Sequence, residues 1–417
     1  LAYVLRYPEL GLKSLGPKLT GTEMITYPQL MKLAAAAGGK GEKKPTHDFR
    51  VALERIPERA IEYAVTDAVA TARIARVLVE EIAGEPKLRR HYRTIEKPLV
   101  PLLLDMEETG VAVDGDALRT LGATLDRELE ANREKLVELG FKGNPNAPND
   151  VVQYLREAGA RLRRLTKKGA PSSDEGQLLE IAGVAKWEDI PHGEGEGSTP
   201  LSAFCFYELY HRQVTRLKST YVEGLLRAMD EGGRVHTQYN QLPATGRLSS
   251  SGPNLQNQPR PESALSSPIR NAFVARPGMV LLKGDWSQIE YRLLAHYTAD
   301  PFLLDVFRRG LDIHIAAAEL LGITRQLAKT ANYALIFGAD AMKVAESVGV
   351  PRDEAEAFAR SFNEKIPGIR VHREQIISQL HDKGYVETPI GWRGYFPLYF
   401  SPLHQEAQKA LREAINC

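Results

Sequence analysis

The spacing of apolar residues along the chain predicts mostly helices. Apolar side chains recur every three or four residues over 48–82, and a Gly-Glu-Pro sequence at 84–86 then ends the pattern. The same spacing predicts a second helix over 96–109, which leads into a short apolar stretch at 111–113. We therefore interpret residues 1–84 as the remainder of one domain, and we expect a domain boundary at 84–86.

A long amphipathic helix followed by a turn predicts a helical arm. The amphipathic run covers 116–140, and Asp114 has a side chain suited to cap the N-terminus of that helix. Turn-forming residues follow at 144–150, and a basic loop covers 161–168. A basic loop at the tip of an arm could hold phosphates through its charge, or it could be an ordinary solvated loop. The candidate nucleic-acid contacts in it are Arg163, Arg164, Lys167 and Lys168.

A short apolar run at 279–283 predicts a buried strand that ends in a carboxylate. Asp285 lies two residues beyond the run, and a helical pattern then extends to His296. A carboxylate at the end of a buried strand is held rigidly, so Asp285 could bind a divalent metal. Ser287 and Glu290 have the spacing of a helix capping box, which explains that pair without any catalysis.

Four residues at four-residue intervals form one stripe of a helix that is predicted to start after Thr324. The stripe extends over about 18 Å if each residue adds 1.5 Å. Its two cations could bind phosphate oxygens and its two aromatic rings could stack on a base, which is the order of a nucleoside triphosphate lying along the helix. A helix with a solvated basic end and a packed aromatic end explains the same pattern. The four residues are Arg325, Lys329, Tyr333 and Phe337.

Residues 245–260 form a loop that is rich in hydrogen-bonding side chains and turn formers. Loops of this composition suit contacts with phosphates and with the minor groove. Amide side chains there meet acceptors that every base pair presents in similar places, so they can test the geometry of a pair without reading its sequence. An ordinary polar loop is the alternative interpretation.

The composition is that of a globular protein. The chain has 417 residues, enough for two or three subdomains, of which 43% are hydrophobic and 26% charged. No apolar stretch approaches the ~20 residues of a membrane-spanning helix. The cysteines are Cys205 and Cys417, so neither a disulfide framework nor a thiolate zinc site is expected. A formal net charge of +1 neither demands nor excludes a nucleic acid as partner.

Three segments, in this order, resemble the motifs of family A DNA polymerases, the group typified by bacterial DNA polymerase I. TGRLSSSGPNLQNQP at 245–259 resembles the primer-template loop, DWSQIEYRLLAH at 285–296 resembles motif A, and RQLAKTANYALIFG at 325–338 resembles motif B. The resemblance implies a multidomain α/β right-hand fold. Its expected parts are a remnant of a ribonuclease-H-like 3′-5′ exonuclease domain (1–86), the palm entry (87–113), the thumb (114–235), the palm with motif A (236–300) and the fingers with motif B, truncated before the chain returns to the palm (301–417).

The resemblance also implies roles for individual residues. Asp285 would bind both catalytic Mg²⁺ ions, for which Mn²⁺ could substitute, and the backbone carbonyl of Trp286 would be a further ligand. Glu290 would be a steric gate against a ribose 2′-hydroxyl, and Lys329 would be catalytic as well as nucleotide-binding. The other nucleotide-binding residues would be Gln288, Ile289, His314, Arg325, Tyr333 and Phe337, and the primer-template contacts would be Arg247, Asn254, Gln256 and Asn257.

Three positions depart from the commoner family sequence. Trp286 and Phe337 stand where the family usually has Tyr, so a hydroxyl near the template base is lost and fidelity could change. Tyr333 stands where Phe is commoner, and this residue should let dideoxynucleotides be used well.

Tyr63 and Asp67 resemble the third motif of the family's proofreading domain, although a surface helix explains Asp67 equally well. The other two proofreading motifs would precede Leu1. Because one carboxylate cannot hold two metals, no exonuclease activity is expected from this chain.

The resemblance ends at 414–416, before the family's glutamine-rich helix and the His-Asp-Glu turn that carries the second catalytic aspartate. We therefore expect this chain alone to be inactive, and a C-terminal polymerase fragment to complete the palm as a second chain. The final Cys417 fits either the junction with a split intein or an ordinary family residue.

The resulting hypothesis is a template-directed DNA polymerase that acts on primer-template DNA and deoxynucleoside triphosphates. The start at Leu1 has neither a basic leader nor a cleavage site, so we expect the cytoplasm of a bacterium or phage-infected host, and no membrane. Two alternatives stay open: a non-catalytic DNA-binding fragment that keeps the hand shape, and a single-subunit RNA polymerase. Glu290 argues against the RNA polymerase, since those enzymes keep that position small.

Overall fold

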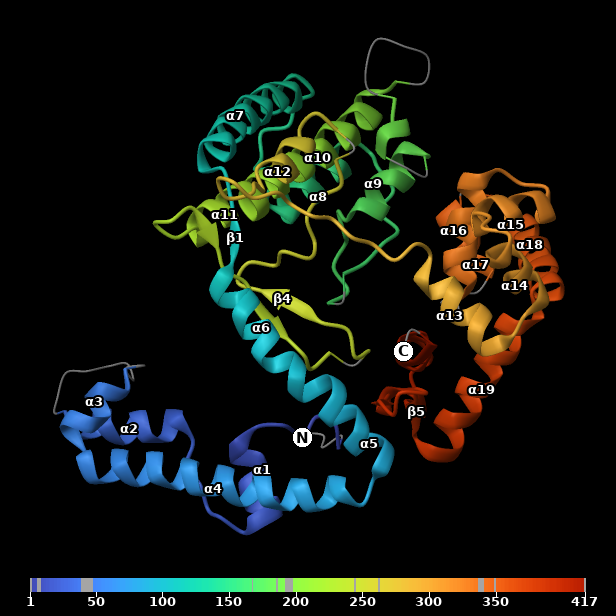
Figure 1. Cartoon of the computed structure of the whole chain (residues 1–417). Coiled ribbons are helices and arrows are strands. Elements are labelled where there is room, and N and C mark those ends of the chain that lie inside the picture. Colours follow the sequence, from blue (N-terminus) through green and yellow to red (C-terminus); the bar gives the residue numbers. More distant parts are fainter. Residues whose placement is uncertain are drawn as a thin grey trace. The chain divides into compact units, whose positions relative to one another are not determined.

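The computed structural model divides the chain into two compact units. The first combines Leu1–Leu102, Gln241–Arg247 and Arg373–Cys417, and the second combines Leu103–Asn240 and Leu248–His372. Both are built mainly of helices (Figure 1). The structure describes residues 2–5, 9–38, 48–166, 168–184, 187–191, 198–243, 245–261, 263–336, 341–348 and 350–415.

The first unit is a set of helices with one short β-hairpin. The hairpin pairs β5 with β6 in antiparallel register, with Val386 opposite Gly394. The elements of this unit are α1 (Leu12–Thr20), α2 (Tyr27–Ala37), α3 (Phe49–Arg55), α4 (Pro57–Ala83), α5 (Pro86–His91), the π-helix η1 (Tyr92–Glu96), the start of α6 (Lys97–Thr109), the end of α19 (Pro367–Lys383), β5 (Tyr385–Glu387), β6 (Arg393–Tyr395), the 3₁₀-helix η4 (Pro397–Phe400) and α20 (His404–Ile415).

The single helix predicted over 48–82 is wrong, because the structure forms two helices there. Asp48 caps α3 by accepting the Arg50 N–H at 3.0 Å, and α3 ends before Ile56. Ile56 has φ −139° and ψ 59°, outside the helical region. The break follows from Pro57, whose ring disfavours helical geometry at the preceding residue but suits the first position of a new helix.

Arg393 fastens the hairpin of the first unit to the residues around α5. Its guanidinium donates to the carboxylates of Glu387 at 2.7 Å and Glu85 at 3.0 Å. Lys87 on α5 donates to the same Glu387 carboxylate at 2.8 Å. Gly391 between the strands has φ +91°, and a side chain there would meet the Lys87 carbonyl at 2.6 Å. The hairpin turn therefore requires glycine both for its backbone angle and for its close approach to α5.

The second unit contains the remaining helices and two further strand pairs, β1 with β2 and β3 with β4. Within the part of the chain that the structure describes, no helix is long and apolar enough to cross a membrane. The elements of the second unit are the end of α6, β1 (Val111–Ala112), α7 (Gly115–Glu138), α8 (Pro148–Glu157), α9 (Glu175–Ala182), the 3₁₀-helix η2 (Trp187–Asp189), α10 (Pro200–Arg216), the π-helix η3 (Leu217–Val222), α11 (Glu223–Ala228), β2 (Arg234–Val235), β3 (Gln238–Asn240), β4 (Ser249–Ser251), α12 (Ser267–Asn271), α13 (Ile289–Thr298), α14 (Pro301–Arg308), α15 (Ile313–Leu321), α16 (Arg325–Ile336), α17 (Ala341–Val348), α18 (Arg352–Lys365) and the start of α19.

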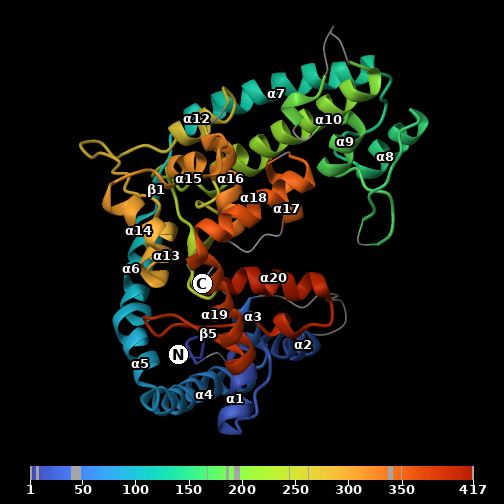
Figure 2. The same cartoon turned by 90° about the vertical axis from the view of Figure 1, so that its right-hand side faces the viewer.

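The predicted amphipathic helix and its aspartate cap are confirmed. The Asp114 carboxylate accepts the N–H groups of Asp116 at 3.0 Å and Ala117 at 2.9 Å, and α7 follows. Helix α7 runs beside α10 in both views (Figures 1 and 2). The two helices contribute to two hydrophobic clusters, whose buried members include Leu118, Leu121, Leu125, Val214 and Leu217 in one, and Leu136, Phe141, Leu155, Leu178 and Phe204 in the other.

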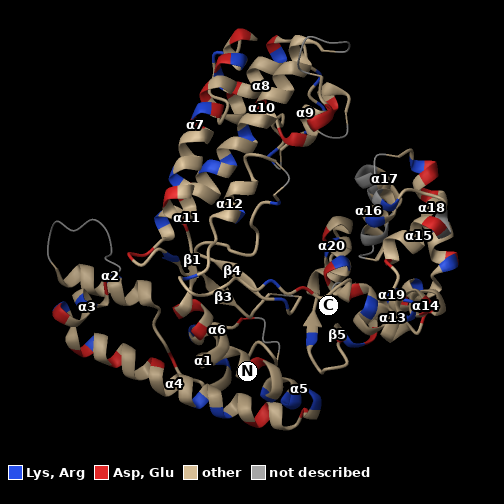
Figure 3. Cartoon of the chain, turned by 45° about the horizontal axis from the view of Figure 1, so that its top comes forward, with Lys and Arg blue, Asp and Glu red and all other residues tan. Residues whose placement is uncertain are grey.

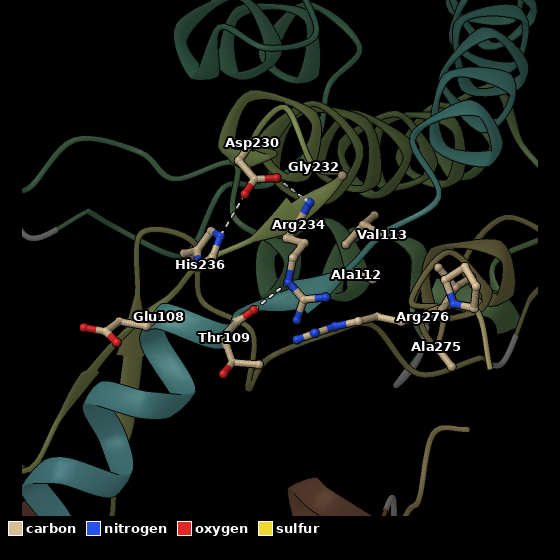
Figure 4. A pocket seen from close by; sticks show the side chains of 13 residues that line it. Glu108, Thr109, Ala112, Val113, Asp230, Gly232, Arg234, His236, Ala275 and Arg276 are labelled. Atoms are coloured by element: carbon tan, nitrogen blue, oxygen red, sulfur yellow. Dashed lines mark hydrogen bonds and ion pairs between the residues drawn. The ribbon is translucent and has the colours of Figure 1, made fainter. Parts of the chain in front are cut away.

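The C-terminal end of α6 is held by two side chains from β2 and the residue after it. Arg234 donates to the carbonyl of Thr109 at 2.5 Å (Figure 4) and to that of Gly110 at 2.6 Å. His236 Nδ1 lies 2.7 Å from the carbonyl of Glu107. These carbonyls have no partner within the helix, and cations favour that end of it. The contact with the Glu107 carbonyl is the main reason why the pKa of His236 is raised. Arg234 and His236 also line a cavity of about 630 Å³.

Helices α13 to α18 enclose their own hydrophobic cluster, with α15, α16, α17 and α18 grouped together in Figure 2. Asp300 links α14 to the start of α19. It caps α14 through the Phe302 N–H at 3.0 Å and also accepts the Gly368 N–H at 2.9 Å. The buried members of the cluster include Tyr291, Leu294, Leu303, Ile313, Leu335 and Phe362.

A carboxyl group is buried in the α7–α10 arm. Glu208 on α10 is fully buried and accepts a bond from Arg212 Nε at 2.7 Å, but its other oxygen has no hydrogen-bond partner among the described residues. Burial raises the pKa of Glu208 to about 7, although the neighbouring Arg212 acts in the opposite direction. A carboxyl group with a raised folded-state pKa favours the folded protein in its protonated form.

We predict that Glu208→Gln makes the stability of the protein less dependent on pH. The wild-type stability contributed by protonated Glu208 is fully present below the ordinary pKa of 4.5 and is lost as the pH rises through about 7. Thermal unfolding at pH 5 and at pH 8 should therefore show a smaller difference in Tm for Glu208→Gln than for the wild type. The exposed Glu138→Gln is the control, and an equal change in that control would contradict the assignment.

Candidate functional site

The segment before Asp285 is exposed and forms no regular secondary structure, so the predicted buried strand is wrong. Residues 279–283 adopt no strand, and 86% of Val280 and 95% of Leu282 are exposed to solvent. No strand pairs with this segment in the described part of the chain. A strand needs a neighbour to satisfy its backbone N–H and C=O groups, and here the described residues supply none. Asp285 is also exposed, three residues before Gln288.

The capping box expected at the start of α13 does not form. Gln288 occupies the N-cap position with φ +53°, and no side chain makes a capping hydrogen bond there. Instead, the Ser287 carbonyl accepts a bond from Arg292 Nε at 2.9 Å. The Gln288 side-chain oxygen accepts the N–H of Ile313 at 3.3 Å, which ties the start of α13 to the start of α15. The left-handed backbone at Gln288 is uncommon for a residue with a side chain and is maintained by its surroundings.

Glu290 and Ile289, the next two predicted nucleotide-binding residues, occupy the first turn of α13. Glu290 is half-buried, and 37% of Ile289 is exposed. The adjacent Trp286, a predicted metal ligand through its carbonyl, is 80% exposed. The described contacts give Trp286 no packed position.

Asp312 joins α15 to α16, a role that the sequence interpretation missed. One oxygen of its carboxylate accepts the N–H groups of His314 at 2.7 Å and Ile315 at 3.1 Å, and so caps α15. The other oxygen accepts a bond from Arg325 Nη2 at 2.8 Å. Burial raises the pKa of Asp312, but the bonds from Arg325 and the two N–H groups outweigh it, and the pKa lies below its ordinary value. The signal in the sequence was an aspartate directly before an apolar helix.

His314 is buried in the first turn of α15, two residues after Asp312. Its side chain is 4% exposed, and its ring packs edge-on against Tyr291 with 5.5 Å between the ring centroids. Burial lowers the pKa of His314, and the cations Arg325 and Lys329 act in the same direction, whereas Asp312 opposes them. The imidazole is therefore mainly neutral at pH 7, and Arg325 and Lys329 are the cations of this cluster.

The predicted helix that carries the cationic stripe is confirmed over Arg325–Ile336. Arg325 and Lys329 are exposed on α16, while Ala328, Ala331 and Leu335 are buried on its other side. The exposed side therefore carries the two cations one turn apart. Tyr333 lies one turn further along the same helix, and Phe337 lies outside the described residues.

The polar loop after β4 is organised by its own amide groups. The Asn254 side-chain oxygen accepts the N–H groups of Gln256 at 3.0 Å and Asn257 at 3.1 Å, and Gln256 Nε2 donates to the Leu248 carbonyl at 3.2 Å. Asn254, Gln256 and Asn257 are all exposed. The Asn254 oxygen thus shapes the loop, while the Asn257 side chain is exposed.

Arg270 also holds this loop, and the sequence interpretation did not single it out. Its guanidinium donates to the carbonyls of Pro259 at 2.6 Å and Gln258 at 3.2 Å. An arginine on a short helix gave no signal of this contact, because it joins residues eleven and twelve positions apart. In the first unit, Arg247 is exposed at the other end of the predicted primer-template segment.

The basic loop of the arm carries less free charge than its sequence suggests. Arg163 lies 3.3 Å from a Glu180 carboxylate oxygen, and Arg164 lies 3.1 Å from one of Asp174. Acidic and basic residues also alternate along α7 (Figure 3). These pairs are half-exposed and weak, so a stronger anion could displace them. Lys168 is exposed, and Lys167 lies outside the described residues.

The two predicted exonuclease residues lie on α4 beside a lysine. Lys13 Nζ forms an ion pair with Asp67 and lies 4.0 Å from the centre of the Tyr63 ring. The three side chains line a cavity of about 90 Å³. The carboxylate of Asp67 thus has an internal cation as its partner. Among the described residues of the whole chain, no group of three or more His, Cys, Asp or Glu side chains could hold a metal.

The chain resembles bacterial DNA polymerases over most of its length. It is 36% identical over 391 residues to DNA polymerase I of Pseudomonas aeruginosa, covering 91% of this chain and 40% of that protein. It is 34% identical over 368 residues to the thermostable DNA polymerase I of Thermus aquaticus, covering 85% of this chain and 42% of that protein. The chain therefore spans about two fifths of the length of these curated relatives.

A solved structure shares the fold. The POL domain of Pol1 from M. smegmatis, in complex with DNA primer-template and dNTP, matches the whole chain and 67% of its own chain, with a TM-score of 0.74 and 26% sequence identity. The chain therefore has a polymerase α/β fold. Helices dominate it, since the described strands are few and short. The family model described as DNA polymerase family A matches residues 115–417. The chain belongs to DNA polymerase family A.

Proposed function

We propose that this chain provides the nucleotide-binding and DNA-binding parts of a template-directed DNA polymerase. The observation that carries the proposal is the exposed cationic face of α16, where Arg325 and Lys329 stand one turn apart next to Asp312 and His314. In this proposal 1–86 is an exonuclease-like remnant, 87–113 the palm entry, 114–235 the thumb, 236–300 the palm with motif A, and 301–417 the fingers.

Each residue of the cationic face has a proposed task. Arg325 presents a planar fork of donors to the oxygens of a triphosphate, and Lys329 adds a point charge one turn further on. Tyr333 and Phe337 offer flat surfaces to the base of the incoming nucleotide. The neutral, buried His314 contributes a hydrogen bond and no charge. Glu290, on the first turn of α13, excludes the ribose 2′-hydroxyl, while Gln288 and Ile289 shape the same part of the site.

The proposed DNA contacts form two groups. Arg247, Asn254, Gln256 and Asn257 face the primer-template duplex, and the exposure of all four supports this assignment. In the arm, the weakly paired Arg163 and Arg164 would exchange Glu180 and Asp174 for DNA phosphates, together with Lys167 and Lys168. Partners of this kind, primer-template DNA and deoxynucleoside triphosphates, are found in the cytoplasm, where we expect the protein.

The described residues supply only part of a magnesium site. Asp285 is an exposed carboxylate, and Trp286 adds a backbone carbonyl, but no cluster of three or more potential metal-ligating side chains exists among the described residues. Two Mg²⁺ ions, or Mn²⁺, would activate the primer 3′-hydroxyl and neutralise the leaving pyrophosphate when bound. The described residues do not fit that pair of ions by themselves, and we propose that the remaining carboxylates lie outside them.

We propose that a further polymerase segment pairs with 279–283 and brings the missing carboxylates. The support is the exposure of this apolar run, of which Val280 and Leu282 are almost fully exposed. A neighbouring strand would satisfy its backbone groups and bury its side chains. The same pairing would hold Asp285 rigidly at the end of a strand.

In the first unit, the ion pair between Lys13 and Asp67 supports a structural rather than a nuclease role for Asp67.

Primer extension tests this proposal. With Mg²⁺ and all four deoxynucleoside triphosphates, we expect no extension by this chain alone and template-dependent extension after addition of the C-terminal polymerase fragment. Hydrogen exchange should show new protection at 279–283 in the mixture, because that segment gains backbone hydrogen bonds.

Two variants sharpen the test. Asp285→Asn should lower the extension rate of the mixture by roughly a hundredfold or more, because one metal-binding charge is lost. Leu282→Lys should prevent protection at 279–283 and extension together. Normal extension by Asp285→Asn would refute the assigned role of this carboxylate. DNA binding without extension in every mixture would favour the alternative, a non-catalytic primer-template DNA-binding fragment, which the single carboxylate keeps open.

We also predict that Tyr333 makes dideoxynucleotides good substrates of the completed polymerase. The ratio of incorporation efficiencies for dideoxy and deoxy substrates should be near one for the wild type and should fall by roughly tenfold or more in Tyr333→Phe, because the phenol hydroxyl can occupy the place of the missing 3′-hydroxyl. This ratio is measured by letting a dideoxynucleotide and the matching deoxynucleotide compete for incorporation at the same template position. Unchanged discrimination in the variant would show that Tyr333 does not lie against the sugar.

A further inference from the structure

Arg325, the first cation of the proposed triphosphate site, already has an anionic partner. Its Nη2 atom lies 2.8 Å from Asp312 Oδ2, and the two side chains are 50% and 26% exposed, respectively. A phosphate oxygen that approached this guanidinium would meet a carboxylate bound to the same group. The effect of Asp312 on triphosphate binding is thus a property of this site. The inference drawn from it rests on the proposed function of α16.

Of the two partners, Asp312 is the less free to move. Its other oxygen accepts the N–H groups of His314 and Ile315, which anchors the carboxylate to the first turn of α15. Those N–H groups have no acceptor within the helix, so a swing of the carboxylate away from them would leave two backbone groups unsatisfied. Arg325 has a long and half-exposed side chain. Separation of the pair therefore requires the guanidinium to move and the carboxylate to stay.

The charges of the cluster show what the carboxylate changes. Arg325 and Lys329 each contribute one positive charge, Asp312 contributes one negative charge, and the buried His314 is mainly neutral at pH 7. These groups sum to one positive charge with Asp312 and to two without it. A triphosphate carries several negative charges, so the carboxylate both repels it and competes with it for the same guanidinium.

We propose that Asp312 is an internal competitor that occupies Arg325 until a polyphosphate displaces it. Binding of the triphosphate then exchanges one ion pair for another, and it does not fill an open cation site. The same competition acts on pyrophosphate after nucleotide transfer: Asp312 recaptures Arg325 and thereby favours release of this product. Asp312 is in this view a positioning residue that sets how tightly the site holds polyphosphates, and it touches no reacting atom.

The variant Asp312→Asn separates charge from structure. Asparagine keeps the side-chain oxygen that caps α15 and is an equally good N-cap, but it removes the negative charge. We expect this variant of the 417-residue chain to bind inorganic tripolyphosphate and pyrophosphate roughly threefold to fivefold more tightly than the wild type at low salt, as is typical for the loss of a half-exposed ion-pair competitor. Isothermal titration calorimetry measures the affinities, and an unchanged Tm shows that the cap is kept.

A double-mutant cycle with Arg325→Ala distinguishes competition from simple repulsion. If Asp312 acts through Arg325, the gain from Asp312→Asn should largely disappear in the Arg325→Ala background. Asp305→Asn is the matched control. Asp305 on α14 forms an exposed ion pair with Arg309, the C-cap residue of that helix, and the variant removes the same charge as Asp312→Asn. We expect less than a 1.5-fold change in that control.

The outcomes separate this inference from the proposed function. Equal or weaker polyphosphate binding by Asp312→Asn overturns the inference, and so does an equal gain in both backgrounds. If the wild type binds tripolyphosphate and Arg325→Ala weakens that binding, the triphosphate face stands whatever Asp312 does. If neither the wild type nor Asp312→Asn binds tripolyphosphate, the proposed function of α16 fails and the inference fails with it.

Discussion

The structure depends on aspartate carboxylates that satisfy the free N–H groups at helix N-termini. Asp114 caps α7, Asp300 caps α14 and Asp312 caps α15, each through two backbone N–H groups. Two of them accept a further hydrogen bond from a distant residue: Asp300 from the N–H of Gly368, and Asp312 from the guanidinium of Arg325. Capping normally contributes about 1 kcal/mol to stability. Here it also fixes the position from which a charged side chain meets its partner, so local helix chemistry determines the geometry of the candidate site.

The parts of the fold that could be predicted are those decided within a few residues of sequence. The spacing of apolar residues and the aspartate before them were sufficient for α7, and the regular stripe was sufficient for α16. The break at Pro57 was missed because the apolar pattern continues across it, although the backbone preference of the preceding residue was readable from the sequence. Short-range chemistry outweighs periodicity at such a point.

The remaining errors concern contacts with distant residues. The run 279–283 has the composition of a strand, but a strand exists only when a neighbour pairs with it, and the sequence of the run does not contain that neighbour. The capping box at 287–290 does not form, and the residue at the N-cap, Gln288, instead accepts the N–H of Ile313, 25 residues away. The basic loop of the arm looked free, yet Glu180 and Asp174 neutralise part of it from α9 and its N-cap. Only the assembled chain reveals partners of this kind.

The exposed run at 279–283 also affects how the isolated chain behaves in solution. Four consecutive apolar residues, Met279 to Leu282, lie outside any helix or strand, and their side chains are exposed to water. Such a segment can recruit the same segment of another copy, edge to edge, as in the early steps of aggregation. The charged residues Lys283 and Asp285 directly after it act as gatekeepers that discourage this self-association. Colloidal solubility and the capacity to pair with a further strand, as proposed above, are thus opposing demands on one stretch of seven residues.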